Sequence, residues 1–170
     1  MSNTFKIQSG LFSFMVIRTM LVLGILFSVH GVLFAQKQAR INEPAQQPTR
    51  ILFLFDASQS MFGRWESDTK FEIAKRLLTQ LTDSLDRIKN VETALHVYGH
   101  LKKFPPQDCD DNRLEVPFAK ANGSRIRAKL NSITPSGTTP IARSLEACGN
   151  DFPEGLSRNI IILITDGIEE

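Results

Sequence analysis

The stretch that decides the fold is "ILFLFDASQS", residues 51–60. Its apolar run continues without a break into Asp56, and Ser58 and Ser60 follow at alternate positions. An apolar run without alternation is typical of a strand that is covered on both faces, as in a parallel sheet flanked by helices. We therefore predict a buried strand at residues 50–55, followed by a loop that carries one carboxylate and two hydroxyl groups.

A second stretch near the end of the chain repeats this pattern. "NIIILITDG", residues 159–167, is another apolar run that reaches an acidic residue, Asp166, just before a glycine. If the two strands lie side by side, Asp56 and Asp166 lie together at one edge of the sheet. Two carboxylates in one place repel each other unless a cation holds them.

The segments between these two strands predict the rest of an α/β domain. Thr69 and Glu72 form a capping box before an amphipathic helix. A second strand is expected from Val91, a shorter edge strand from Arg113 and, after a weaker helix, a last helix with Pro140 at its first position. This order predicts a doubly wound fold, a mostly parallel sheet with helices on both faces and one antiparallel edge strand.

The direction of each element predicts which loops meet. Open α/β sheets bind ligands outside the carboxyl ends of their strands. Four loops are expected at this end: residues 56–66, 100–112, 134–140, and 166 onward. The final strand is followed by too few residues to supply a further strand and helix, so we expect the domain, residues 50–170, to be incomplete at its C-terminus.

Composition argues against nucleic acid as a partner. The chain of 170 residues is 42% hydrophobic and 22% charged, which is ordinary for one globular domain with a real core. The net charge of +2 comes from Lys6 and Arg18, since basic and acidic residues balance after Ala35. The domain therefore lacks the basic excess that neutralises phosphates.

The first 35 residues predict a signal peptide. Arg18 precedes the apolar stretch "TMLVLGILFSV", and Ala35 is a small residue suited to cleavage. An uncleaved membrane anchor is the alternative, because the apolar character extends back to Leu11. We expect an exported protein, periplasmic or secreted, that touches a membrane only if this segment is retained. Residues 36–49 are polar, contain two prolines and are expected to be a linker.

The side chains expected at the carboxyl end of the sheet predict a metal site. They are Asp56, Ser58, Ser60, the pair Thr138/Thr139 and Asp166. Carboxylate and hydroxyl oxygens without histidine or thiolate favour a hard divalent cation. Mg²⁺ fits best, with Mn²⁺ or Ca²⁺ as alternatives.

Three motifs in this sequence, "DASQS" from Asp56, "SGTTPIA" around Thr139 and "ITDG" at Asp166, resemble the metal-ion-dependent adhesion site of von Willebrand factor type A domains. The resemblance covers about residues 50–170. It implies that Ser58, Ser60 and Thr139 bind the ion directly, with Thr138 as the substitute for Thr139. It also implies that Asp56 and Asp166 act mainly through waters, and that an acidic residue of a partner protein completes the shell.

The resulting expectation is a metal-dependent protein-binding domain, not an enzyme, in an exported bacterial protein. The alternative is a hydrolase that uses the same Mg²⁺ to activate water. No general base is evident for that reaction, and residue 58 is serine where Mg²⁺ phosphatases carry a second aspartate. A serine hydrolase is weaker still, because "DASQS" lacks a glycine elbow.

Other polar residues receive more modest predictions. The acidic loop that includes Asp108, Asp110 and Asp111 is interpreted as solvated, with a second cation or a partner contact as the alternative. Trp65 either contacts a partner or packs under the site loop.

The histidines and cysteines of the domain are not assigned to the site. His96 and His100 lack an obvious metal or nucleophile partner, so we assign them no chemistry. Cys148 is predicted in the core, too far from Cys109 for a disulfide. If Cys109 is paired, its partner lies beyond residue 170.

Overall fold

A computed structural model describes residues 47–167 of the chain. The predicted signal peptide and most of the predicted linker lie outside these residues. The linker prediction runs slightly too far, because Thr49 already begins the first strand and Pro48 accepts a hydrogen bond from the Arg158 backbone at 3.0 Å. None of the described helices is both long and apolar enough to cross a membrane.

The centre of the domain is a four-stranded sheet in the order β5-β4-β1-β6. Three strands run parallel, β1 (Thr49–Asp56), β4 (Val91–Tyr98) and β6 (Arg158–Ile164), and β5 (Asn112–Ala119) pairs antiparallel with β4 at the edge. The continuous apolar run at residues 51–55 therefore forms an interior strand, and the prediction of one antiparallel edge strand is confirmed.

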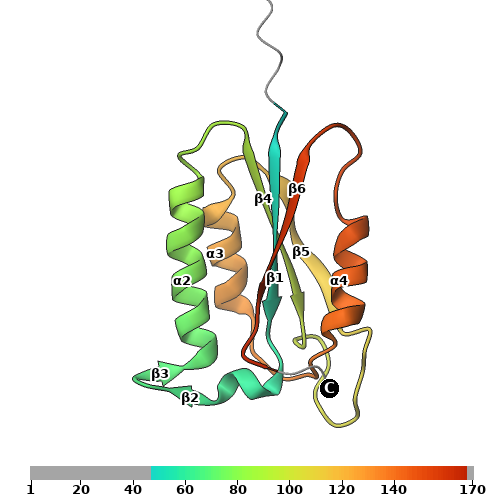
Figure 1. The fold of residues 1–170 in the computed structure, drawn as a ribbon. Coiled ribbons are helices and arrows are strands. Elements are labelled where there is room, and N and C mark those ends of the chain that lie inside the picture. Colours follow the sequence, from blue (N-terminus) through green and yellow to red (C-terminus); the bar gives the residue numbers. More distant parts are fainter. Residues whose placement is uncertain (1–46, 168–170) are drawn as a thin grey trace, which may run out of the picture. The chain divides into compact units, whose positions relative to one another are not determined.

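Helices cover both faces of the sheet, which confirms the doubly wound class (Figure 1). On one face, α2 (Lys70–Leu85) and α3 (Gly123–Ser132) pack over Phe53 and Phe55. On the other face, α4 (Ile141–Asn150) packs over the alternate β1 residues, Leu52 and Leu54. Successive strand side chains point to opposite faces, so an unbroken apolar run supplies two cores at once.

The helix starts agree with the sequence in one case and differ slightly in the other. At α2, Thr69 is the N-cap, and its hydroxyl oxygen accepts a hydrogen bond from the Glu72 backbone at 3.2 Å. At α4, Pro140 occupies the N-cap and Ile141 is the first helical residue, one position later than predicted. Because proline has no N–H to satisfy, it is well suited to this boundary.

The loop after β1 contains short elements that the sequence did not predict. These are a 3-10 helix, η1 (Gln59–Phe62), and a two-stranded hairpin formed by β2 (Arg64–Trp65) and β3 (Asp68–Thr69). Their two- to four-residue lengths are too short to give a periodic pattern. They carry the chain from the end of β1 directly to the N-cap of α2.

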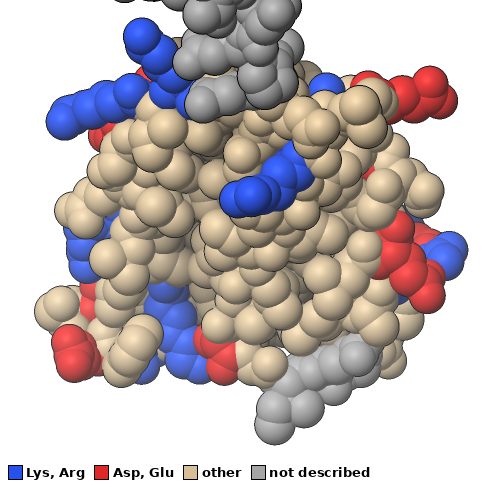
Figure 2. All heavy atoms as spheres, turned by 45° about the horizontal axis from the view of Figure 1, so that its top comes forward, with Lys and Arg blue, Asp and Glu red and all other residues tan. Residues whose placement is uncertain are grey.

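The strand β6 lies at the other edge of the sheet and remains partly exposed. Ile160, Ile161 and Leu163 keep 36–37% of their surface exposed. A groove of about 320 Å³ runs between α2 and β6 and reaches Lys70 and Asp166. In the view of Figure 2 the centre of the surface is mostly uncharged, and most charged side chains lie around its margin.

Candidate metal-binding site

Backbone hydrogen bonds hold the predicted site loops together at the carboxyl end of β1. The Ser136 N–H contacts two carbonyl oxygens, Ala57 O at 3.0 Å and Gly99 O at 3.1 Å. The Gln59 N–H donates to Gly137 O at 2.9 Å. The loops that follow β1, β4 and α3 are therefore bonded directly to one another, as the direction of the elements predicted, at the lower end of Figure 1.

Two glycines make this close approach of loops sterically feasible. Gly99 has a φ of +73°, and a Cβ there would lie 2.7 Å from both Ser58 N and Thr138 O. At Gly137 a Cβ would lie 2.5 Å from a carboxylate oxygen of Asp111. Side chains larger than hydrogen would push these loops apart, so the glycines determine how close the site loops come.

Four of the five predicted ligands form one hydrogen-bonded cluster. The Asp56 carboxylate accepts from the Ser58 backbone N–H at 2.8 Å and from the Thr165 hydroxyl at 2.7 Å. The hydroxyl oxygens of Ser58 and Ser60 lie 3.0 Å apart, and the Ser60 hydroxyl donates to Asp166 at 2.9 Å. The ends of β1 and β6 thus bring these side chains to one place although 110 positions separate Asp56 from Asp166.

Thr139, the fifth predicted ligand, lies in the loop that is bonded to Ser58 but is not part of the side-chain cluster. It is two residues beyond Gly137, which forms a parallel bridge with Ser58, and it is only 3% exposed. Among the described residues, no hydrogen bond joins its hydroxyl to the four clustered side chains. Its neighbour Thr138 donates its hydroxyl to the Asp108 backbone carbonyl at 2.9 Å, so that hydroxyl already has a structural role.

The charge at the cluster is incompletely balanced. Asp56 is fully buried and has no ion-pair partner among residues 47–167. The neighbouring Tyr98 hydroxyl is also buried, with no well-oriented hydrogen bond in the described part of the chain. Burial, and then the negative charge of Asp56, raise the pKa of Tyr98 above its ordinary value, so this hydroxyl stays protonated. A buried carboxylate without a counter-charge is costly, and a cation would relieve that cost.

Lys70 supplies the one positive charge that contacts the cluster among the described residues. Its ammonium group forms an ion pair with Asp166, and the two side chains are 34% and 9% exposed. Sequence analysis missed this contact because Lys70 and Asp166 lie 96 positions apart, and only the packing of α2 beside β6 brings them together. The ammonium therefore neutralises the Asp166 carboxylate in this structure.

The donor set of the cluster fits a hard divalent cation. It offers carboxylate and hydroxyl oxygens, without imidazole or thiolate, which is the chemistry of Mg²⁺ sites. The buried Asp56 carboxylate has hydrogen bonds but no positive counter-charge among the described residues, and the neighbouring Tyr98 hydroxyl has no well-oriented hydrogen bond there. The residues present are therefore compatible with the cation that the sequence predicted.

The acidic loop differs from its prediction at one residue. Asp111 is 1% exposed, and its carboxylate accepts hydrogen bonds from the backbones of Leu101 and Lys102 at 2.9 and 3.1 Å. The interpretation as solvated is wrong for Asp111, because the carboxylate organises the loop from inside. By contrast, Asp110 is exposed and pairs with Arg143. The exposed Trp65, at 60%, does not pack under the site loop.

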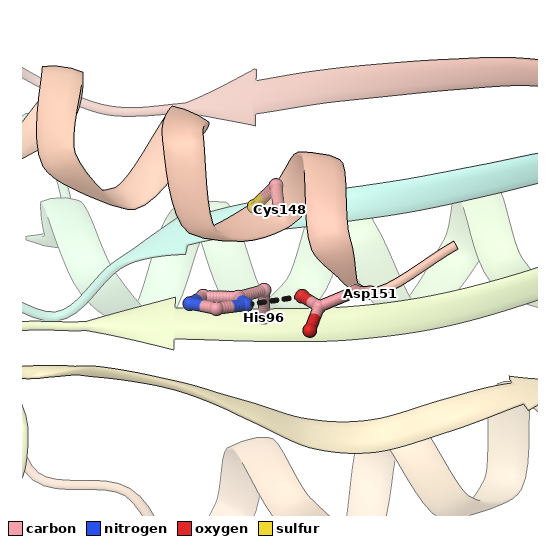
Figure 3. Close-up of side chains that lie close together, drawn as sticks. All are labelled: His96, Cys148 and Asp151. Atoms are coloured by element: carbon pink, nitrogen blue, oxygen red, sulfur yellow. Dashed lines mark hydrogen bonds and ion pairs between the residues drawn. The ribbon is translucent and has the colours of Figure 1, made fainter. Parts of the chain in front are cut away.

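Each of the two described histidines lies beside a carboxylate that the sequence did not predict. His96 Nδ1 lies 2.6 Å from the Asp151 carboxylate, and its ring lies beside the Cys148 thiol (Figure 3). His100 Nε2 lies 2.8 Å from the Glu115 carboxylate. These partners come from α4 and β5, so strand alternation alone gave no signal of them.

Both cysteines are free. Cys148 is fully buried, as predicted, and Cys109 is exposed.

The fold and the cluster define a class of protein: a doubly wound α/β domain with carboxylate and hydroxyl oxygens gathered at the carboxyl edge of its sheet. Residues 51–169 match the von Willebrand factor type A domain, and the chain belongs to this family.

Relatives and solved structures are similar to this chain at modest identity. An uncharacterized protein, YwmC of Bacillus subtilis (strain 168), is 28% identical over 152 residues, which cover 86% of this chain and 65% of YwmC. An aerotolerance-related membrane protein from Bacteroides fragilis shares the fold with a TM-score of 0.58 and 23% identity, over 72% of this chain and 56% of that one. The pilus adhesin SpaC from Lactobacillus rhamnosus GG shares the fold with a TM-score of 0.57 and 20% identity, over 74% of this chain and 15% of SpaC. The chain thus spans less than two thirds of each of these proteins.

Proposed function

We propose that this protein binds a partner protein through a divalent cation, Mg²⁺ in the first place, held at the carboxyl end of its sheet. The observation that carries the proposal is the hydrogen-bonded cluster of Asp56, Ser58, Ser60 and Asp166. The cation would be held by these four residues and Thr139. When bound, it supplies a Lewis-acidic centre that can accept a carboxylate from the partner.

The described residues prepare the site for this role in distinct ways. Asp56 supplies buried negative charge, and its two hydrogen bonds, from Ser58 and Thr165, fix its orientation. The Ser60 hydroxyl lies between Ser58 and Asp166, so it links the β1 loop to the end of β6. Only two of the five side chains are acidic. A divalent cation would keep most of its attraction for an acidic side chain of a partner.

We also propose that the protein is exported and that its partner is a protein. The apolar stretch before residue 35 favours export, either periplasmic or secreted, with membrane anchoring as the alternative. Two similar folds support an interaction role outside the cytoplasm, since one is a pilus adhesin and another a membrane protein by description. The nearly balanced charge after Ala35 supports a protein partner over nucleic acid.

The first test measures cation binding by the full chain. Mn²⁺, titrated by the loss of its free electron paramagnetic resonance signal, is expected to bind one site and to be displaced by Mg²⁺. Asp56→Ala should remove that binding, whereas Asp83→Ala, an exposed acidic residue on α2 paired with Arg127, should not. Equal binding by both variants would overturn the proposed site.

The second test measures carboxylate recognition. A glutamate-containing peptide should bind the immobilised chain more tightly in Mg²⁺ than in EDTA, and a matched glutamine peptide should show no such difference. Equal retention of the two peptides would contradict a cation-mediated mechanism even if the cation itself binds.

The hydrolase alternative gains no support from the described residues. Both described histidines are engaged with carboxylates, His96 with Asp151 and His100 with Glu115. Neither is hydrogen-bonded to the oxygen cluster. Mg²⁺-dependent turnover of phosphate or carboxylic esters by the full chain, abolished by Asp56→Ala, would favour the enzyme over the binding domain.

A further inference from the structure

A second group of side chains with metal-ligand chemistry lies on the α4 face of the sheet, between β4 and α4. His96, Cys148 and Asp151 each offer one donor atom, and the three atoms lie within 4.8 Å of one another (Figure 3). Imidazole nitrogen, thiolate sulfur and carboxylate oxygen together are ligands of Zn²⁺, whereas Mg²⁺ requires oxygen. The chemistry of this group therefore differs from that of the oxygen cluster.

The fold delivers these side chains to one point. His96 lies on the face of β4 that packs against α4, in register with Leu54 of β1. Cys148 lies in the last turn of α4. Asp151 is the C-cap of this helix, and its backbone N–H donates a hydrogen bond to the Cys148 carbonyl at 3.2 Å. The end of α4 thus holds two donors over one strand residue.

The group is largely buried, and its histidine has a second partner. Cys148 is fully buried, and the side chains of His96 and Asp151 are 3% and 17% exposed. The second ring nitrogen of His96 lies 3.0 Å from the Asn112 side-chain oxygen. Metal-bound histidines commonly donate their other N–H to such a partner, which fixes the orientation of the ring.

We propose that His96, Cys148 and Asp151 form a binding site for Zn²⁺ or a chemically similar transition metal, with a fourth position left to water. In the alternative, the hydrogen bond between His96 and Asp151 only ties α4 to β4, and Cys148 is an apolar core residue beside Leu52 and Leu54. The site is independent of the oxygen cluster.

Metal binding would require side-chain movements of about 1 Å and the loss of the thiol proton. In a tetrahedral Zn²⁺ site the donor atoms lie about 3.3–3.8 Å apart, from bond lengths of about 2.0–2.3 Å. The His96–Asp151 contact of 2.6 Å must open, and the sulfur must approach by up to about 1.3 Å from the 4.8 Å limit. Burial and the charge of Asp151 raise the pKa of the Cys148 thiol to about 12 without metal. Binding therefore releases the thiol proton to solvent.

The test uses Co²⁺ as a spectroscopic probe on the reduced full chain. A thiolate-to-cobalt charge-transfer band should appear at one equivalent and disappear when one equivalent of Zn²⁺ is added. Cys148→Ser should abolish the band. Cys109→Ser and Asp56→Ala should leave it, because the exposed cysteine and the oxygen cluster lie outside the site. Absence of the band in the unaltered chain, or its survival in Cys148→Ser, would overturn the proposal.

A second variant protects the test against misfolding. Asp151→Asn keeps an oxygen that can accept the hydrogen bond from His96 Nδ1 but removes the charged ligand. It is expected to keep the far-ultraviolet circular dichroism of the unaltered chain and to bind Zn²⁺ at least tenfold more weakly in competition with a chromophoric chelator. Unchanged Zn²⁺ affinity in Asp151→Asn would remove Asp151 from the site and contradict the proposal as stated.

Discussion

At the scale of single residues, the charge balance of the proposed metal-binding site depends on Lys70. Its ammonium group pairs with Asp166, one of the predicted ligands, so a bound divalent cation has to share or displace it. We expect Lys70→Met to tighten Mn²⁺ binding roughly fivefold, since a partly exposed ion pair is worth about 1 kcal/mol. Lys75→Met is the matched control, because Lys75 pairs with Glu72 on the same helix. Weaker binding by Lys70→Met would mean that the ammonium supports the site.

Gly99 is the second residue whose replacement has a defined consequence. Its φ of +73° disfavours other residues, and a Cβ would meet the Ser58 and Thr138 backbones at 2.7 Å. Gly99→Ala should lower the free energy of unfolding by about 1–3 kcal/mol from the backbone conformation alone. Gly149→Ala is a control with the opposite expected sign. A Cβ at this helical position meets nothing within 4 Å, so the substitution should raise the free energy of unfolding by about 0.5–1 kcal/mol. Urea denaturation of both variants measures the two effects.

Residue chemistry explains which parts of the site were predictable. Asp56, Ser58, Ser60 and Asp166 each follow an apolar strand run, so strand order alone predicted that they meet, and the hydrogen bonds of the cluster agree with that expectation. Lys70 carried no such pattern, because a lysine in the first turn of an amphipathic helix is ordinary. Its contact depends on tertiary packing, which the sequence does not encode locally.

At the scale of elements, Glu115 ties β5 to its neighbours. The carboxylate accepts from His100 at 2.8 Å, pairs with Lys129 of α3 and Arg113 of β5, and is 4% exposed. Burial alone would raise its pKa, but these hydrogen bonds and positive charges outweigh burial and lower the pKa to about 2.

The lowered pKa of Glu115 makes a pH-dependent prediction. An unfolded glutamate titrates near 4.5, so the stabilisation is fully present above that pH and is lost as the pH falls towards 2. Glu115→Gln should reduce the free energy of unfolding by about 3 kcal/mol at pH 7, and the loss should shrink on acidification. Glu146→Gln, an exposed partner of Arg143, should change little at any pH. A pH-independent loss in Glu115→Gln would contradict the ion-pair explanation.

Element boundaries followed the sequence where the signal was periodic or chemical. The apolar runs predicted β1 and β6 within about one residue, and the capping box located the start of α2 at Thr69. The hairpin of β2 and β3 was missed because two residues contain no period. The carboxylate partners of His96 and His100 were missed because strand alternation predicts the face of the sheet on which a side chain lies, but not the residues that pack against that face.

At the scale of the whole described domain, the β6 edge of the sheet leaves apolar side chains exposed on both of its faces. Among residues 47–167, β6 pairs with β1 on one side only, and Leu163 is 37% exposed. Leu163 lies on the α4 face of β6, and on the opposite face α2 exposes Leu77 at 58% beside the groove. An unpaired strand edge with apolar side chains promotes association between chains, so this surface should limit the concentration at which the chain stays monomeric.

A pair of lysine substitutions tests that expectation. Leu163→Lys places a charge on the β6 edge, and should raise the concentration at which sedimentation velocity first detects oligomers. Leu156→Lys makes the same chemical change at an 82% exposed loop position outside the sheet and should leave that concentration unchanged. Equal improvement in both variants would show that net charge controls association, since the two substitutions add the same charge. If only Leu163→Lys raises that concentration, association between chains takes place through the β6 edge. The oxygen cluster at the end of β6 would then be a separate binding site.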